Sequence, residues 1–568
     1  MKINIDNKFC LLCSLVFLVL QSCKEKTTEK AKIFEKPNIV FITTDYTRGV
    51  DLPAMGASFL KAPAIEKLGK EGAVFSKHNC ITPVCSPARA SIATSLYAHD
   101  HGLWDNQGLS IKKPEWPFLM RELQAAGYTT AGIGKMHFHP FKADYNFDIR
   151  ISLEGKDRDY RDDDYEAYLV KNGTSRKAIR EKDIGTDLPS GQAFYPWHVD
   201  EILHPDYFVG EKSVETIKNG ALTQDKPWFM WVSFTGPHNP WNPPKRYFDL
   251  YKDVEVPTGH FVEGELKNKP IDYTRHRYGY GGNLMNIYDT IQSPEAKEAF
   301  RRDLRIGHYA SLSFVDEQIN RVLQQLKEQN LLKNTIVIFT SDHGSALFDN
   351  EMMHKGSPFP TQSLVPMVVW APEYIEAGIR EGFTSHVDIY PTLLELAGGE
   401  IHPKAAGKSF VSMLNSKNEK IHDFTVIESA LVTSLMADDW LIGFSHISKQ
   451  IELYDLNKDP MCHYNVANIE SNKSVIQKLQ NMLVNWRREQ SPELEVGGNP
   501  LYWTMDVLGN EESTTRLWNS YVRAYKRLTK IDEKKPGVVG QSAIEVLKNI
   551  AQDDLEGINM GTNMNELH

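Results

Sequence analysis

The chain contains little cysteine for its length, with six cysteines among 568 residues. Cys10 and Cys13 lie in an apolar N-terminal run, and the other four are too few and too scattered for a disulfide framework. A small disulfide-stapled fold is therefore excluded. Cys80 and Cys85 are close enough in sequence to close a small disulfide loop, and this alternative to a free thiol at either position stays open.

A surplus of positive charge is also lacking, because 64 Lys and Arg stand against 74 Asp and Glu, a formal net charge of -10. Nucleic acids are bound chiefly through such a surplus, so no nucleic-acid partner is expected. An anionic ligand would need a locally positive pocket. There is no internal repeat, and 41% hydrophobic with 24% charged residues indicates a folded globular protein, long enough for one large domain and a smaller one.

Long apolar runs are scarce, and the run at 9–20 is too short to span a bilayer as a helix. Because lysines precede it, residues 1–22 are predicted to be a signal peptide. The segment that ends at Cys23 resembles the lipobox of bacterial lipoproteins, in which this cysteine becomes the lipidated N-terminus. We expect an exported protein, periplasmic or at the cell surface, anchored to the membrane only through Cys23 and a tether at 23–36. Ordinary secretion with cleavage nearby is the alternative.

Continuous apolar and β-branched runs predict strands that are buried on both faces. They lie at 38–44, 129–133, 228–234, 335–340 and 367–370. Helical stretches separate them, the clearest being apolar positions at three- and four-residue spacing from Phe300 to Leu326. The alternation predicts an α/β sandwich with a mostly parallel central sheet over 37–400, whose ligands gather at the carboxyl ends of the strands.

The pattern changes after residue 400. Short strands are predicted at 440–444 and 450–454, and one helix at 471–488, which indicates a smaller C-terminal α+β subdomain over 401–495 with a short antiparallel sheet. Residues 496–568 form an extension without an assigned role. Two segments, 142–204 and 241–298, show no helical or strand periodicity of apolar residues. They are predicted to be long insertions that shape a pocket.

The segment Cys85-Ser86-Pro87-Ala88-Arg89 opens a predicted helix at 90–96. Pro87 suits a first helical turn, and a helix N-terminus favours negative charge beside residue 85. The segment resembles the C-x-P-x-R signature of the type I sulfatases, in the alkaline-phosphatase-like superfamily, and the likeness extends through most of 37–490. Further family motifs follow in the family's order, at 37–42 with Asp45, 127–137, Pro237-His238, 341–344, Lys355 and 452–456.

This resemblance implies that a maturation enzyme oxidises Cys85 to formylglycine. A hydrated aldehyde offers one hydroxyl to attack the sulfur of a sulfate ester and a second to expel sulfate afterwards. The resemblance also implies that Arg89 anchors the hydrate or the metal ligands, and that Lys135 and Lys355 bind the sulfate oxygens. The chain is therefore expected to be a sulfuric ester hydrolase.

Two histidines complete the catalytic set that the resemblance implies. His137 is expected to hydrogen-bond the diol and act as the base in sulfate release. His238 is expected to protonate the leaving oxygen, a role that a histidine can fill near neutral pH.

A divalent cation is expected beside the nucleophile, held by Asp45, Asp342, His343 and the oxygen of modified Cys85. Hard oxygen ligands favour Ca²⁺ or Mg²⁺, and the resemblance points to Ca²⁺. Many family members carry a second Asp where this chain has Tyr46, so one carboxylate ligand is missing and the metal can differ accordingly.

The expected substrate is a sulfated carbohydrate, because an exported hydrolase with aromatic and basic insertions suits an anionic polymer. The insertion residues to examine are Trp197, His198, Trp241, Arg246, Arg275, His276 and Arg277, each as well suited to packing as to binding. One alternative is a phosphodiester or phosphonate monoester hydrolase of the same superfamily. A second is a surface lipoprotein that binds glycans without turnover, which would follow if Cys85 stayed a thiol.

Overall fold

The computed structural model describes residues 36–106, 110–155, 162–183, 194–220, 222, 225–270, 273, 282–429, 432–445 and 450–490. The predicted signal peptide, Cys23, the tether, the C-terminal extension and three insertion residues, Arg275, His276 and Arg277, lie outside this part of the chain. Within it, no helix is both long enough and apolar enough to cross a membrane.

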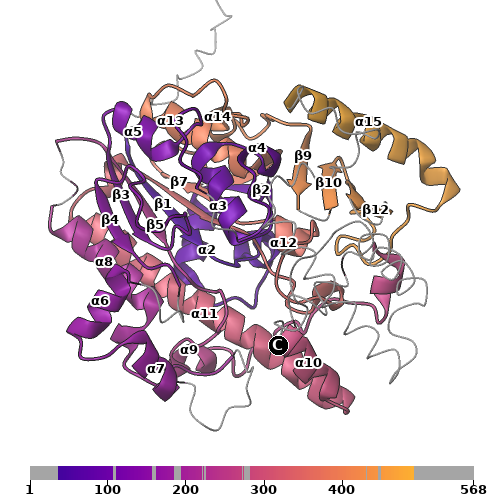
Figure 1. The fold of residues 1–568 in the computed structure, drawn as a ribbon, viewed down its shortest axis with the longest axis horizontal. Helices are drawn as coiled ribbons and strands as arrows, with labels where there is room; N and C mark the ends of the chain where they lie inside the picture. Colours follow the sequence, from indigo (N-terminus) through magenta and orange to yellow (C-terminus); the bar gives the residue numbers. More distant parts are fainter. Residues whose placement is uncertain are drawn as a thin grey trace, which may run out of the picture. The chain divides into compact units, whose positions relative to one another are not determined.

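An eight-stranded sheet forms the centre of the molecule, in the order β4-β3-β5-β1-β6-β7-β2-β8 (Figure 1). Its strands are β1 Asn38–Thr44, β2 Ala73–Asn79, β3 Thr129–Gly134, β4 Ile149–Ser152, β5 Trp228–Ser233, β6 Thr335–Ser341, β7 Met367–Trp370 and β8 Gly378–Ser385. Only β7 runs antiparallel to its neighbours in this sheet. The predicted mostly parallel α/β sandwich is confirmed.

Helices cover both faces of the central sheet, as parallel strands that are buried on both sides require. Val40 and Ile42 of β1 share an apolar cluster with Leu68 of α2, Phe208 of α8 and Val315 of α11. Helices α3, α5 and α13 lie together on the opposite side (Figure 1). The described helices are α2 Pro63–Glu71, α3 Cys85–Thr94, α4 Ala98–His101, α5 Leu119–Ala125, α6 Asp164–Lys171, α7 Arg176–Asp183, α8 Pro205–Lys218, α9 Lys245–Asp249, α10 Gly282–Thr290, α11 Pro294–Glu328, α12 Pro360–Ser363, α13 Ile389–Ala397, α14 Val411–Asn415 and α15 Lys473–Gln490.

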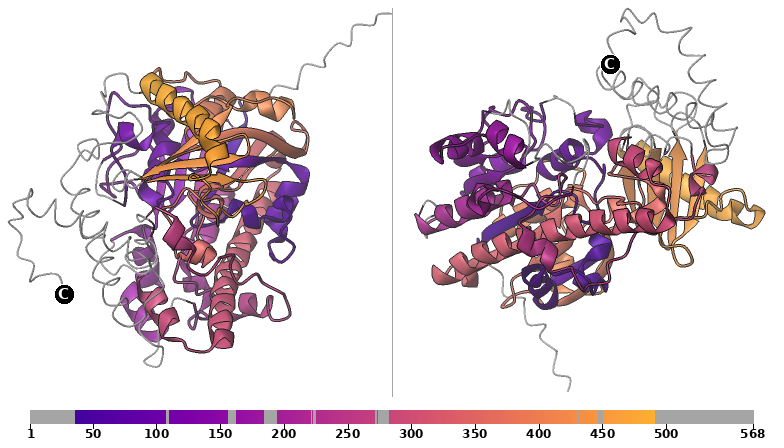
Figure 2. Two further views of the ribbon diagram at one scale, coloured as in Figure 1. Left: turned by 90° about the vertical axis from the view of Figure 1, so that its right-hand side faces the viewer. Right: turned by 90° about the horizontal axis from the view of Figure 1, so that it is seen from below.

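A second, four-stranded antiparallel sheet lies in the C-terminal part, in the order β12-β11-β10-β9. Its strands are β9 Phe424–Glu428, β10 Val432–Ala437, β11 Trp440–Ser445 and β12 Ile451–Asp455. Helix α15 lies across this sheet (Figure 2), where Leu483 and Trp486 share a cluster with Leu435 and Ile442. The predicted C-terminal subdomain with a short antiparallel sheet is present.

The segments predicted to be insertions contain regular structure. The first holds β4, an edge strand of the central sheet, together with α6 and α7, and it ends just before α8. The second holds α9, α10 and the first turn of α11. β4 alternates apolar and polar residues, but it has only four residues and each is half-buried, so the alternation is too short to predict a strand from the sequence.

Candidate active site

The predicted site residues gather where four neighbouring parallel strands end. Strands β3, β5, β1 and β6 are adjacent in the sheet, and parallel strands bring their carboxyl ends to one edge. Past these ends lie Lys135 and His137 after β3, His238 after β5, Asp45 after β1, and Asp342 and His343 after β6. The pairing continues into the loops, since the backbone N–H of Asp342 donates to Thr44 at 3.1 Å.

Gly134 ends β3, and its backbone conformation allows the chain to turn into Lys135. Its φ is +95°, and a Cβ there would lie 2.0 Å from the carbonyl oxygen of Ser233. Only glycine tolerates both conditions. The backbone N–H of Lys135 then donates to that same carbonyl at 3.0 Å, which fixes the direction of the loop.

Helix α3 carries the proposed nucleophile at its first residue. Cys85 begins the helix, earlier than the sequence predicted, and Arg89 lies one turn along the same fully buried helix. The backbone N–H of Ser86 donates to Oδ1 of Asn106 at 3.0 Å, so one N-terminal amide of the helix is satisfied from a neighbouring loop. Cys80 and Cys85 are both free thiols, so the alternative disulfide loop is not formed in the structure.

Asp45, Cys85, Asp342 and His343 present ligand atoms that all lie within 4.8 Å of one another. Cys85 Sγ lies 3.7 Å from each Asp45 carboxylate oxygen and 3.3 Å from His343 Nε2. His343 Nδ1 lies 2.8 Å from the Gly344 carbonyl, which directs the Nε2 lone pair at the cluster. Two buried carboxylates and this imidazole suit a divalent cation.

Arg89 links the metal-ligand cluster to the neighbouring loop. Its Nε donates to Asp342 Oδ2 at 2.9 Å, and its Nη1 donates to the Lys135 carbonyl at 2.6 Å and to Ser233 Oγ at 2.7 Å. Burial alone would lower the pKa of the guanidinium, but Asp342 and Asp45 raise it above the usual value. Arg89 is therefore a fixed cation that holds Asp342.

The ammonium group of Lys355 contacts Cys85, and that of Lys135 contacts the neighbouring Asp45. Lys355 Nζ lies 2.6 Å from Cys85 Sγ and 3.2 Å from His343 Nε2, and Lys135 pairs with Asp45. Burial would raise the pKa of Asp45, yet Lys135 foremost, with His238 and Lys355, holds it well below its usual range. Burial and Asp45 raise the pKa of Cys85, but the two lysines lower it overall.

The two predicted catalytic histidines lie on separate loops around this centre. His137 is buried, and its backbone N–H donates to Glu154 Oε2 at 2.8 Å. His238 is half-buried, with Nδ1 2.5 Å from the carbonyl of Asn239. Burial, reinforced by the nearby lysines, lowers the pKa of both imidazoles well below 6.5, so both are neutral in the protein without substrate.

Tyr46 fills the position of the missing second carboxylate with an aromatic ring. Its ring centroid lies 4.5 Å from that of His238 and 4.7 Å from that of His343, both edge-on. Lys355 Nζ lies 4.4 Å above the ring, an attractive arrangement for a cation. The backbone N–H of Tyr46 donates to Asp342 Oδ1 at 3.4 Å, so the residue packs the cluster together.

Several residues that hold the site were missed by the sequence analysis. Ser233 accepts from Arg89 and bonds the Lys135 carbonyl, Glu154 holds the backbone of His137, and Asp206 holds the turn before His238. A serine at the end of an apolar strand and single acids in irregular segments carry no sequence signal for these roles.

The described insertion residues are mostly engaged in packing. Trp241 is fully buried and its Nε1 donates to the Pro237 carbonyl at 2.6 Å, so its ring supports the His238 turn and cannot stack on a sugar. Arg246 pairs with Glu201 and Glu317. Trp197 packs against the core, and His198 is exposed.

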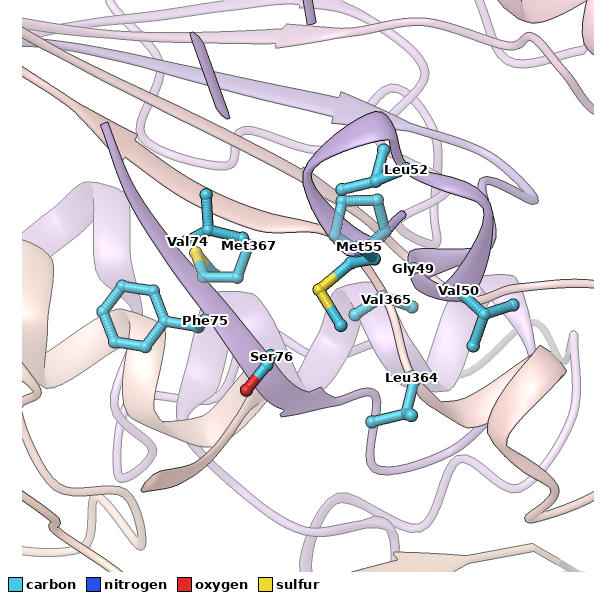
Figure 3. A pocket seen from close by; sticks show the side chains of 11 residues that line it. Gly49, Val50, Leu52, Met55, Val74, Phe75, Ser76, Leu364, Val365 and Met367 are labelled. Carbon is cyan, nitrogen blue, oxygen red and sulfur yellow. The ribbon is translucent and has the colours of Figure 1, made fainter. Parts of the chain in front are cut away.

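One pocket lies between strand β2, the segment 49–55 and the residues that lead into β7 (Figure 3). Its lining consists of Gly49, Val50, Leu52, Met55, Val74, Phe75, Ser76, Leu364, Val365, Pro366 and Met367. None of these side chains titrates and none belongs to the predicted site, so the pocket offers no acid, base or metal ligand.

The fold and the site together suit a hydrolase of anionic esters, because Cys85 begins a buried helix beside a cluster that could hold a metal ion and beside Lys135 and Lys355. A family model described as Sulfatase matches residues 37–399, and one described as N-sulphoglucosamine sulphohydrolase, C-terminal, matches residues 342–489. The chain belongs to the sulfatase family. It is a sulfuric ester hydrolase, as the sequence predicted.

Among curated relatives, an arylsulfatase of Clostridium perfringens is 30% identical over 79% of this chain and 94% of its own. A protein solved in complex with its substrate D-glucosamine-2-N,6-O-disulfate has a TM-score of 0.66 at 18% identity, covering 81% of this chain and 99% of that one. The phosphonate monoester hydrolase of Agrobacterium radiobacter has a TM-score of 0.68 at 24% identity, covering 80% and 96%. The two structures share the fold.

Proposed function

We propose that the protein removes sulfate from a sulfated carbohydrate through a formylglycine made from Cys85. The observation that carries the proposal is the position of Cys85 Sγ, 2.6 Å from Lys355 Nζ and 3.3 Å from His343 Nε2 at the start of helix α3. A hydroxyl at this position would lie among the cations that an incoming sulfate needs. A thiol alone lacks the second hydroxyl that expels sulfate from the covalent intermediate.

In the proposed reaction one hydroxyl of the hydrated aldehyde gives its proton to solvent water, its oxygen forms a bond to sulfur, and the bond from sulfur to the ester oxygen breaks. Lys135 and Lys355 neutralise charge on the non-bridging sulfate oxygens. His238 gives a proton to the leaving oxygen. A bound sulfate would raise the pKa of this imidazole, because a nearby anion favours its protonated form.

Release of sulfate regenerates the aldehyde in this proposal. His137 takes the proton of the remaining hydroxyl while the bond from carbon to the sulfate oxygen breaks. The neutral imidazole of His137 is the form that can accept this proton. Arg89 keeps Asp342 and the Lys135 backbone in place through both steps.

Asp45, Asp342 and His343, with the oxygen of residue 85, would hold a divalent cation. Such a cation would lower the pKa of the nucleophilic hydroxyl and polarise the sulfate. Ca²⁺ is the ion expected from the family resemblance, whereas an imidazole ligand also suits Mn²⁺ or Zn²⁺. Removing metal with a chelator and restoring Ca²⁺, Mn²⁺ or Zn²⁺ one at a time identifies the ion, and recovery by another ion only would contradict the Ca²⁺ assignment.

The nucleophile is tested by mass spectrometry of the peptide that carries Cys85, from a host with the maturation machinery. We expect the mass of the aldehyde or its hydrate. Cys85→Ala should abolish hydrolysis of para-nitrophenyl sulfate, whereas the matched control Cys80→Ala, a buried thiol outside the ligand cluster, should retain it. Only thiol at Cys85, or undiminished turnover by Cys85→Ala, would refute the assignment.

Carbohydrate specificity and export complete the proposal. The solved protein bound to a disulfated glucosamine shares this fold, which supports a sulfated sugar as the substrate class. The predicted signal peptide and lipid anchor at Cys23 would place the enzyme where it meets extracellular glycans. Desulfation of glycosaminoglycan and algal oligosaccharides, and lipid labelling of Cys23, test these two parts separately.

Phosphonate and phosphodiester hydrolysis is the second candidate function. It is favoured by the fold shared with a phosphonate monoester hydrolase and by the His343 ligand, which departs from an all-oxygen site. Sulfate and phosphate esters share a tetrahedral shape. A higher kcat/KM on a phosphonate monoester or phosphodiester than on the matched aryl sulfate would show that the phosphorus ester is the preferred substrate.

A further inference from the structure

Four charged side chains form a buried cluster that the proposed reaction does not use. Arg48 Nε lies 2.9 Å from Asp51 Oδ2, and Arg48 Nη2 lies 2.6 Å from Asp349 Oδ2. Arg305 of α11 lies 2.8 Å from the other oxygen of Asp349. Two cations therefore balance two carboxylates, and all four residues are buried.

The Asp349 carboxylate fastens the loop that connects β6 to Lys355. Besides the two arginines, it accepts the backbone N–H of His260 at 2.5 Å. Arg305 Nε also donates to the carbonyl of Leu347 at 2.9 Å, so one guanidinium binds the loop both at Leu347 and at Asp349. Asp349 is thus the central contact between this loop, helix α11 and the segment after β1.

The loop needs such an anchor because its backbone is strained. Left-handed φ angles occur at Leu347, Phe348, Asn350, Glu351 and His354, between +46° and +71°. Such angles are unfavourable for residues other than glycine and persist only where surrounding contacts enforce them. A relaxed loop would carry its end, and the residue that follows it, to another position.

Lys355 follows this strained segment directly and reaches the nucleophile, with Nζ 2.6 Å from Cys85 Sγ. Arg48 lies three residues after Asp45. The charged cluster therefore connects the segment that carries a metal-binding acid to the loop that carries a sulfate-binding lysine.

We infer that Asp349 is a positioning residue for Lys355, holding the loop so that the ammonium group meets the sulfate oxygens. The inference rests on the proposed function, in which Lys355 binds sulfate. A merely structural carboxylate would stabilise the fold without acting through Lys355. Asp51 is the matched control, because it belongs to the same cluster and pairs with Arg48 and Tyr309, and it reaches the Lys355 loop through Arg48, whose Nη1 makes a long hydrogen bond of 3.4 Å to the Ala346 carbonyl.

The test is a pair of double-mutant cycles with kcat/KM on para-nitrophenyl sulfate and inhibition by inorganic sulfate as readouts. Asp349→Asn and Asp51→Asn are each made in the wild-type chain and in a Lys355→Ala chain. We expect Asp349→Asn to lower kcat/KM by about 100-fold in the wild-type chain, the effect of a misplacement of about 1 Å. In the Lys355→Ala chain the same change should cost less than about threefold, because the two residues act as one unit.

Asp51→Asn should change kcat/KM by less than about threefold in both chains, as expected for a site not coupled to Lys355. Asp349→Asn should also weaken inhibition by inorganic sulfate, and Asp51→Asn should not. Equal losses from Asp349→Asn in the two chains, or no loss in the wild-type chain, would overturn the positioning role. If circular dichroism shows Asp349→Asn unfolded, Arg305→Lys takes its place under the same criteria.

Turnover by the wild-type protein is measured first, because it distinguishes a failure of the proposed function from a failure of the positioning role. Absence of any sulfate ester hydrolysis by the matured wild-type protein contradicts the proposed function. Normal wild-type turnover with additive Asp349 and Lys355 effects contradicts only the positioning role.

Discussion

Asp206 should control protonation of the leaving group without touching the substrate. Its Oδ1 accepts the backbone N–H of Thr235 at 2.8 Å, the Thr235 hydroxyl at 2.8 Å and the backbone N–H of Gly236 at 2.9 Å. The carbonyl of Gly236 in turn accepts the backbone N–H of Asp45 at 3.1 Å. One buried carboxylate thus holds the turn from which His238 projects.

The contacts set the size of the expected effect. Asp206→Asn keeps an acceptor oxygen but exchanges three charge-assisted hydrogen bonds for neutral ones, a loss of about 1 kcal/mol each and about 3 kcal/mol of unfolding free energy in total. Asp206→Ala leaves three buried donors unpaired, at about 2 kcal/mol each, which approaches the whole stability of a typical domain. The Asn variant is therefore the informative one.

Displacement of His238 should matter most for poor leaving groups, because general acid catalysis is worth about 100-fold or more only where the leaving oxygen needs a proton. We expect Asp206→Asn to lower kcat on an alkyl or sugar sulfate by about 100-fold and on para-nitrophenyl sulfate by less than about threefold. Both rates are measured on the same preparation, with unfolding followed by circular dichroism.

The control is Asp316→Asn, which alters another buried carboxylate that accepts backbone N–H groups, from Ala64 and Ile65, far in sequence from the site residues. It should leave the ratio of the two rates unchanged. Equal losses on both substrates by Asp206→Asn would refute the reasoning, since a general loss of fold or of metal binding does not depend on the leaving group.

Ser233→Ala should lower kcat and cost about 1–3 kcal/mol of stability, because Arg89 loses a 2.7 Å partner in a fully buried site; urea unfolding and kinetics check both. Glu154→Ala, which leaves the backbone N–H of His137 unpaired, should reduce activity more than Glu154→Gln, and equal losses would contradict this. His101 is buried and burial lowers its pKa to about 3. The unfolded chain then binds the extra proton below pH about 6.5, so stability falls as pH drops, by about 2 kcal/mol at pH 5. His101→Asn, which can still accept from Leu103 N, should show a smaller fall in Tm between pH 7.5 and 5.

The strands that place the site could be predicted because they are buried on both faces. β1, β5 and β6 are buried along their whole length, and each contains an unbroken apolar run of at least four residues that ends in polar residues at the carboxyl end of the strand. By contrast, β2 ends in Ser76 to Asn79 and β8 contains Arg380 and Glu381, so neither resembles a strand of a buried sheet. Arg380 is tolerated there because it donates to five backbone carbonyls, three between Glu376 and Ile379 and two at Met413 and Leu414, contacts that no local pattern reveals.

The roles of insertion aromatics could not be predicted for a related reason. Trp241 is followed by a polar, proline-rich segment typical of an exposed loop, yet it packs with Met285 of α10 and Leu304 of α11. Stacking on sugar and packing in a core require the same side chain. Only the long-range contacts distinguish them, and these place Trp241 beneath the His238 turn.

The acids around the site explain how a chain of net charge -10 keeps a positive centre. Arg89, Lys135 and Lys355 converge on Asp45 and Asp342, leaving one positive charge in excess before any cation binds. The positive charges of these three side chains repel one another, so each loop that carries a lysine must be held rigidly.

That rigidity comes from carboxylates that bind backbone N–H groups. Glu154 holds the loop of His137, Asp206 the turn before His238, and Asp349 the segment of His260 that packs on the Lys355 loop. Because these acids bind backbone N–H groups and arginines outside the ligand cluster, they do not neutralise Lys135 and Lys355. A carboxylate moved from such a contact to Lys355 itself would keep the net charge and abolish anion binding.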